Sequence, residues 1–188
     1  MKEYKLELCG VKRVLPFIPI DGKRAFASFV VIGDTEMVSA CAPALAERIG
    51  TVDAIVTAEA KGIALAYEIS RILGLKEFIV ARKSTKNYMR NTVSASLHSI
   101  TTSGKQNLYL DGTDAEKIRG KNVCLLDDVI STGESLLALE ALMKNADASV
   151  VKKAALLAEG EAALRDDIIF LQKLPLFYKT EEGDYEAL

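Results

Sequence analysis

Two adjacent carboxylates, followed closely by small hydroxyl residues and a glycine, form the stretch of this chain best suited to chemistry. Asp127 and Asp128 come directly after the apolar residues 123–126, and two apolar residues later the chain reads Ser-Thr-Gly-Glu-Ser. Neighbouring carboxylates repel each other, so burying both without partners costs several kcal/mol. A vicinal diol relieves that cost, because its two hydroxyls can donate to the two acids.

The residues after the acids, 131–135, suit a phosphate group. They supply consecutive backbone N–H groups, side-chain hydroxyls and the start of a predicted helix, and the chain reverses at Gly133. Acids for a sugar diol beside a cradle for its 5′-phosphate predict a ribose 5-phosphate site. The simpler alternative is that the acids end a strand and that Ser131 or Thr132 caps a helix.

A second anion site is indicated by "TAEAKG", residues 57–62, which also joins a predicted strand to a predicted helix. Backbone amides at such a junction attract anions, and Lys61 adds a positive charge. The alternative for this segment is an ordinary turn that carries a surface lysine. A second basic cluster follows, for which the alternative is a solvated basic turn. That cluster places four cations within nine residues after a strand: Arg82, Lys83, Lys86 and Arg90.

The elements that must position these residues alternate between short apolar strands and amphipathic helices. Such alternation predicts an α/β fold with a mostly parallel central sheet flanked by helices, and ligands bind such sheets at the carboxyl ends of the strands. Asp34 is expected to cap one helix, Pro43 to kink or split it, and Gly50 to end it. Strands are predicted at 53–58, 77–82, 122–127, 149–158 and 168–171, and helices at 35–49, 61–73 and 134–146.

Two further regions differ from this core. Residues 13–20 and 24–33 read as a hairpin around Asp21-Gly22, which makes residues 1–33 a small N-terminal unit and 34–188 the α/β core. Residues 84–110 are polar, with only short alternating pieces, and are predicted to be a mobile functional loop.

Composition limits the functional classes. The 188 residues carry a formal net charge of -2, which does not favour nucleic acid or an anionic membrane as a partner. The start of the chain lacks the apolar region of a secretory signal, and the sequence has no apolar run long enough to span a membrane. Three cysteines without paired spacing suit a reducing compartment, so we expect a cytoplasmic protein.

The acid pair and its loop resemble the phosphoribosyl pyrophosphate (PRPP) signature of type I phosphoribosyltransferases, which is two acids followed by x-x-x-T-G-x-S/T. The "EAKG" of residues 59–62 is similar to the E-A-R-G form of adenine phosphoribosyltransferases, and the Arg82-Lys83…Lys86 spacing also resembles that group. The resemblance covers about residues 50–145. It implies the type I phosphoribosyltransferase fold, with residues 1–33 as a hood over the base.

The resemblance also implies roles for individual residues. Asp127 and Asp128 would be catalytic and hold the ribose, and Phe17 and Phe29 are candidates for the base pocket. A cis peptide is expected in the pyrophosphate loop, at Ala60–Lys61. The ribose 5-phosphate would lie on Asp127, Asp128, Ser131, Thr132, Gly133, Glu134 and Ser135, and the pyrophosphate on Glu59, Ala60, Lys61, Arg82, Lys83 and Lys86.

The activity implied is transfer of the phosphoribosyl group from PRPP to a purine, with adenine favoured and Mg²⁺ held through PRPP and water rather than by direct protein ligands. A homodimer is expected, as in the family. Two departures stand out: Glu134 replaces a common glycine, and "TTSGK" at 101–105 lacks the loop glutamate that moves a proton in adenine-type members. The alternatives are a xanthine, hypoxanthine or guanine phosphoribosyltransferase, and a non-catalytic PRPP-binding regulator.

Overall fold

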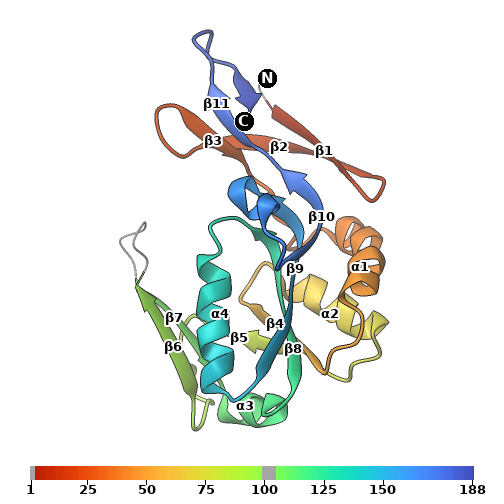
Figure 1. The fold of residues 1–188 in the computed structure, drawn as a ribbon, viewed down its shortest axis with the longest axis vertical. Helices are drawn as coiled ribbons and strands as arrows, with labels where there is room; N and C mark the ends of the chain where they lie inside the picture. Colours follow the sequence, from red (N-terminus) through yellow and green to blue (C-terminus); the bar gives the residue numbers. More distant parts are fainter. Residues whose placement is uncertain (1–2, 99–104) are drawn as a thin grey trace.

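The computed structural model describes residues 3–98 and 105–188, which form a parallel α/β core with an antiparallel sheet above it (Figure 1). The core sheet has the order β10-β9-β8-β4-β5, and all four neighbouring pairs are parallel. The α/β fold predicted from the sequence is therefore confirmed. The strands are β4 (Ala54–Ala58), β5 (Ile79–Ala81), β8 (Asn122–Ile130), β9 (Ser149–Glu159) and β10 (Ile169–Leu174).

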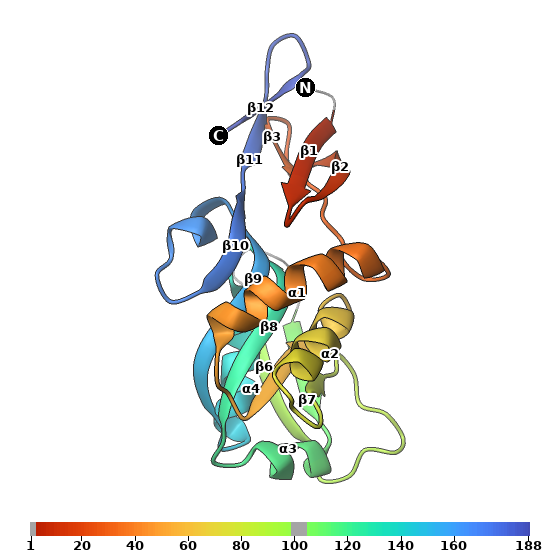
Figure 2. The same cartoon turned by 90° about the vertical axis from the view of Figure 1, so that its right-hand side faces the viewer.

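Helices cover both faces of this sheet and make two hydrophobic cores. On one face, α1 (Thr35–Ile49) and α2 (Ile63–Ile72) pack around Leu45 and Leu65. On the other, α4 (Glu134–Asn145) packs with the hairpin of β6 (Val93–His98) and β7 (Lys105–Leu110). The short helices α3 (Gly112–Ile118) and η1 (Gly160–Leu164) complete the core, and Figure 2 shows α1 and α2 side by side.

The central strand β8 explains why the acids lie where they do. Its residues 123–126 are all fully buried, as expected for a parallel strand covered on both faces. This continuous apolar run fixes the strand in the middle of the sheet. The polar residues that follow it must therefore emerge at the carboxyl edge.

The antiparallel hood sheet is built from both ends of the chain. Its order is β1-β2-β3-β11-β12, so the predicted hairpin is joined by one further N-terminal strand and two C-terminal strands that the sequence did not assign to it. Both termini accordingly lie in this layer (Figure 1). The strands are β1 (Glu3–Leu8), β2 (Val11–Pro19), β3 (Arg24–Ala27), β11 (Leu176–Lys179) and β12 (Tyr185–Ala187).

The first helix begins and ends as its sequence indicates. The Asp34 side chain accepts a hydrogen bond from the Met37 N–H at 3.1 Å, and Gly50 ends the helix with φ 66°. The helix runs unbroken through Pro43, so the alternative of a split helix is wrong. Asp34 also pairs with Arg13 of the hood at 2.7 Å, which holds the pKa of Asp34 below its usual value and ties the hood to the core.

Asp34→Ala should therefore lower the free energy of unfolding by about 1–2 kcal/mol, because it removes a helix cap and a half-buried ion pair together. Urea unfolding at pH 7 measures this. Glu36→Ala is the matched control: Glu36 also contacts Arg13, at 2.8 Å, but is 70% exposed and should cost less than about 0.5 kcal/mol. Equal losses in the two variants would contradict this account of the helix start.

Candidate functional site

The two acids extend beyond the neighbouring strand at the carboxyl edge of the sheet. Pairing of β8 with β4 ends at Thr57 and Leu126, whereas pairing with β9 continues through Asp127 to Ile130. Asp127 is half-buried and Asp128 has no exposed surface. The acid pair therefore lies at the carboxyl edge of the sheet, as the sequence predicts, and ligand binding at this edge stays a prediction.

Asp128 is a buried carboxylate whose charge has few stabilising contacts with the described residues. Lys61 lies 3.0 Å from its Oδ1, but neither carboxylate oxygen accepts a well-directed hydrogen bond from the described residues. The Asp128 N–H donates to Asp127 Oδ1 at 2.8 Å, which keeps the two acids together. Burial, and then the Asp128 charge, raise the pKa of Asp127 to about 7. Two acids held in this way favour a ligand that brings its own hydrogen-bond donors.

The turn after the acids has the backbone of an anion cradle. Gly133 adopts φ 80°, a left-handed conformation that glycine accepts readily, and α4 begins at the next residue. Ser131 and Thr132 are exposed there, while Glu134 and Ser135 are half-buried in the first turn of the helix. A Cβ at Gly133 would lie 2.8 Å from a terminal nitrogen of Arg165, so this cation rests against the turn.

The second loop, between β4 and α2, is packed tightly against the sheet. A Cβ at Gly62 would come within 2.4 Å of Thr57 Oγ1, so the loop can approach the strand only with glycine here. The cis peptide in this loop joins Glu59 and Ala60, so its predicted place at Ala60–Lys61 is wrong. Ala60 and Lys61 are exposed and Glu59 is half-buried.

Part of the basic cluster is connected to this loop. Arg82 lies 3.0 Å from Glu59, and the Lys83 N–H donates to the same carboxylate at 2.6 Å. Lys86 instead donates to Ser84 at 2.8 Å and makes no ion pair with the described residues. The structure therefore brings together Glu59, Arg82 and Lys83, and separately Lys61 and Asp128.

The two aromatic candidates for base binding have packing partners in the hood. Phe29 is only 6% exposed, in the core beneath the hood. The Phe17 ring packs 4.6 Å from Phe177 and 4.7 Å from Tyr185, measured between ring centroids. Their contact with a base stays a prediction. The predicted loop at about 84–110 includes Thr101 and Thr102, which lie outside the described residues.

One acid at this edge was missed from the sequence. Glu159 is the last residue of β9, at the carboxyl edge beyond Ile130 of β8, and burial raises its pKa to about 7 while the charge of Lys61 opposes that shift. The available signal was an acid directly after the apolar run 154–158, the same pattern that places Asp127.

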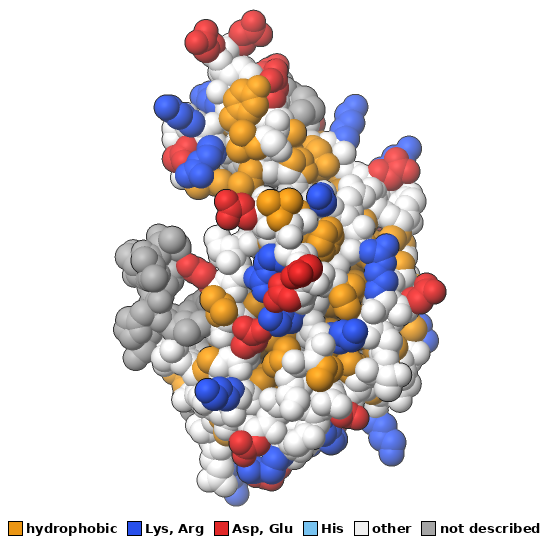
Figure 3. All heavy atoms as spheres, viewed as in Figure 1, with side chains coloured by type: hydrophobic (Ala, Val, Ile, Leu, Met, Phe, Trp, Pro, Cys, Tyr) orange, Lys and Arg blue, Asp and Glu red, His pale blue; other side chains and the backbone are white. Residues whose placement is uncertain are grey.

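The surface around the site carries charges of both signs. In Figure 3, acidic and basic side chains are interspersed across the middle of the visible face, below the hood. Among the ion pairs of the described residues, Lys153 pairs with Glu140 and Asp167, and Arg165 pairs with Asp167. The visible face therefore offers no broad patch of one sign.

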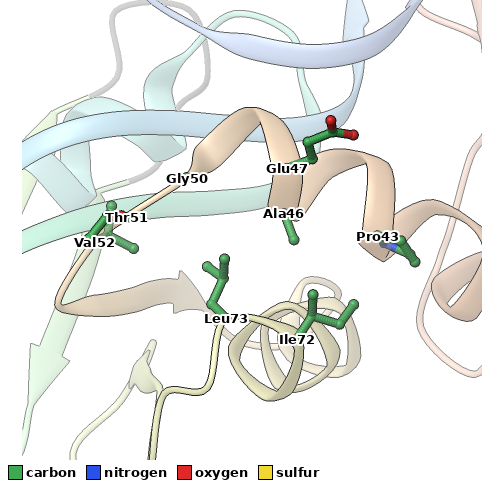
Figure 4. Close-up of a pocket in the computed structure, with 8 residues that line it drawn as sticks. All are labelled: Pro43, Ala46, Glu47, Gly50, Thr51, Val52, Ile72 and Leu73. Carbon is green, nitrogen blue, oxygen red and sulfur yellow. The ribbon is translucent and has the colours of Figure 1, made fainter.

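A cavity of about 420 Å³ lies elsewhere, between the ends of α1 and α2 (Figure 4). Gly50 and Val52 of its lining precede β4, so it opens at the amino ends of the strands, opposite to the acids. The figure shows Glu47 as its one charged side chain, pointing away from Leu73 and Ile72. Nothing in this lining resembles the acid-and-cation arrangement of the other edge.

In residues 3–98 and 105–188, no three His, Cys, Asp or Glu side chains gather into an arrangement that could hold a metal ion. Over the same part of the chain, no helix has both the length and the apolar character needed to cross a membrane.

Comparison with known proteins identifies the family. Residues 33–181 match the model of the phosphoribosyl transferase domain. The chain belongs to this family, so the resemblance drawn from the acid pair and its loop is confirmed. Among curated relatives, a hypoxanthine/guanine phosphoribosyltransferase of Methanococcus voltae is 34% identical over 61% of this chain and 58% of its own length. A xanthine phosphoribosyltransferase of Clostridioides difficile is 26% identical over 70% of this chain and 71% of its own.

Solved structures support the same fold. The adenine phosphoribosyltransferase of Thermoanaerobacter pseudethanolicus matches with a TM-score of 0.67 at 23% identity, covering 85% of this chain and 95% of that one. The Saccharomyces cerevisiae adenine phosphoribosyltransferase matches with a TM-score of 0.66 at 20% identity, covering 90% and 94%. The M. voltae relative is matched over little more than half of its length. Sequence and structure thus point to differently named purine enzymes.

The raised pKa of Asp127 has a consequence for stability. In the unfolded chain, the pKa of an aspartate carboxyl is about 3.9, so the folded chain binds the Asp127 proton more tightly than the unfolded chain does. The contribution of Asp127 to stability therefore falls as the pH rises from about 4 to about 7. Asp127→Asn cannot titrate. The free energy of unfolding of this variant, relative to that of wild type, should therefore be roughly 1–3 kcal/mol higher at pH 8 than at pH 5, as measured by urea unfolding.

The control for this measurement is Asp147→Asn, which removes a carboxyl that is 69% exposed beyond the far end of α4. Its unfolding free energy should track wild type at both pH values. If the Asp127→Asn curve also runs parallel to wild type, the acid pair is not buried as described.

Proposed function

We propose that this chain is a purine phosphoribosyltransferase, which transfers the 5-phosphoribosyl group of PRPP to a purine base and releases pyrophosphate, with adenine as the favoured base. The observation that carries this proposal is the state of Asp128: a fully buried carboxylate, paired among the described residues only with Lys61, at the edge where β8 leads into an anion-binding turn. A ribose diol supplies the donors that these acids lack.

The rest of the site divides between the two ends of PRPP. The 5-phosphate lies on the turn of residues 131–135, where the backbone N–H groups at the start of α4 and the hydroxyls of Ser131 and Thr132 receive it. The pyrophosphate lies on residues 59–61 and on the cations Arg82, Lys83 and Lys86. With both ends held, C1′ is fixed beside Asp127 and Asp128, whose charges stabilise the positive charge that develops there.

Mg²⁺ fits this site as an ion that is carried by the substrate. The described residues contain no cluster of acids that would bind it alone, whereas PRPP oxygens and water provide the oxygen ligands it prefers. When bound, the ion neutralises charge on the leaving pyrophosphate. The side chains of Lys61 and Arg82 orient the same group and add to that neutralisation.

We also propose that the chain acts as a homodimer in the cytoplasm. Tyr67 of α2 is 59% exposed and lines an apolar cavity of about 420 Å³ with Ile63 and Phe78, a surface suited to cover by a second copy. Light scattering of the purified chain should give twice the mass of one chain, and a monomer at micromolar concentration would contradict this part of the proposal.

The names of the sequence relatives favour a second candidate, a hypoxanthine, guanine or xanthine phosphoribosyltransferase. The deciding experiment supplies PRPP, Mg²⁺ and one of adenine, hypoxanthine, guanine or xanthine, and measures pyrophosphate release. Turnover is expected with adenine, at a kcat/KM at least about tenfold above each of the others. A preference for a 6-oxopurine would establish the second candidate, and PRPP binding without any turnover would favour a regulator.

The double variant Asp127→Asn with Asp128→Asn tests the site itself. Amides cannot supply the two negative charges, so we expect the affinity for PRPP to fall at least about 100-fold, which calorimetry would show. The matched control is the double variant Asp147→Asn with Asp114→Asn, which makes the same change of charge at exposed or half-exposed carboxyls. Its affinity for PRPP should stay within about twofold of the wild-type value, roughly the error of the method. Unchanged PRPP binding in a folded double variant would refute the assignment.

A further inference from the structure

The proposed site leaves one carboxylate at the same edge without a role. Glu159 ends β9, where Leu174 of β10 pairs with it on one side, and Ala158 before it pairs with Ile130 of β8 on the other. Asp127 itself pairs with Ala155, so Glu159 lies further along the sheet, beyond Ile130, at the same carboxyl edge. The Glu159 carboxylate makes no hydrogen bond or ion pair with any described residue.

Lys61 links Glu159 to the acid pair. Lys61 Nζ lies 3.0 Å from Asp128 Oδ1, and the charge of the same lysine also acts on Glu159. Two residues before Glu159, Leu157 packs in the core formed with α1 and with α2, the helix that follows Lys61. Glu159 and Asp128 therefore share one cation at this edge.

The other acids of this edge are already engaged. Asp127 and Asp128 are assigned to the ribose diol, and Glu59 is held by Arg82 and by the Lys83 N–H. The loop stretch at 101–105 contributes no acid, so the residue that moves a proton to or from the base was left open by the sequence. Glu159 is half-buried and unpaired among the described residues, and the charge of Lys61, the partner of Asp128, acts on it.

We propose that Glu159 is a catalytic residue that contacts the incoming purine and accepts the proton from its ring nitrogen. This inference rests on the proposed function. The nitrogen lone pair forms the bond to C1′, and the bond from C1′ to the pyrophosphate oxygen breaks, leaving its electron pair on pyrophosphate. The N–H proton passes to the Glu159 carboxylate, so charge and atoms balance. Release of the product returns the proton to water.

The electrostatic surroundings suit this role. Burial raises the pKa of Glu159 to about 7, close to the value at which a general base works best near neutral pH. The charged group that acts on it is Lys61, from the loop before α2, which also pairs with Asp128.

The test compares Glu159→Gln and Glu159→Asp with a matched control, Glu161→Gln, an exposed acid two residues away on η1. With the base that wild type uses, Glu159→Gln should lower kcat by about 100-fold while the Kd for PRPP, measured by calorimetry, stays within about twofold. Glu159→Asp should recover part of kcat, since it restores a carboxylate. Glu161→Gln should match wild type in both quantities.

Each outcome separates this inference from the proposed function. If wild type turns over and Glu159→Gln keeps its kcat, Glu159 is not catalytic and the proposed function stands. If Glu159→Gln loses PRPP affinity along with kcat, Glu159 shapes the PRPP site and the proton-transfer role is overturned. If wild type turns over no purine, the proposed function falls and the role of Glu159 falls with it.

Discussion

The burial of Asp128 beside a single lysine is the interaction on which the rest of the site depends. A carboxylate with no exposed surface needs compensation, and in this chain the described residues provide only Lys61, at 3.0 Å. Neither Asp128 oxygen accepts a well-directed hydrogen bond from the described residues, and both acids lie at the carboxyl edge of the sheet. A fold that leaves such capacity unused loses stability, and binding a polyhydroxyl ligand recovers it.

Three loops converge on that point because the strands that precede them are parallel. The turn after β8, the loop after β4 and the end of β9 all leave the sheet at its carboxyl edge. Two of the loops can approach the sheet or reverse only through glycine: Gly62 under the Thr57 hydroxyl and Gly133 in its left-handed conformation. The hood, tied to the core through Arg13 and Asp34, closes the same edge from above. Positive charge and backbone amides thus surround the acids, which suits a ligand with phosphates at both ends.

The parts of this arrangement that the sequence predicts are those encoded locally. The acid pair, the Thr-Gly turn and the "EAKG" loop each follow an apolar strand directly, so their place at one edge could be inferred before the structure was known. Glu159 obeys the same rule, but a lone acid after a strand carries no pattern that distinguishes it from a solvated strand end. Its significance depends on which strand lies beside β9, and that is a property of the whole sheet.

The hood shows the same limit. The hairpin around Asp21-Gly22 could be predicted from its turn residues. In contrast, β11 and β12 join it through pairing between the two ends of the chain, such as Phe177 with Ala25. Pairing over such a separation leaves no periodic signal in either segment. The cis peptide was misplaced by one residue, because the resemblance located the loop but not the bond within it.

The most direct test of the central claim is a crystal structure of the chain with PRPP and Mg²⁺. The ribose hydroxyls should lie within hydrogen-bonding distance, about 2.5–3.0 Å, of the carboxylates of Asp127 and Asp128, with the 5-phosphate on residues 131–135. Density for PRPP at another place, with Asp128 still bound only to Lys61, would contradict the claim.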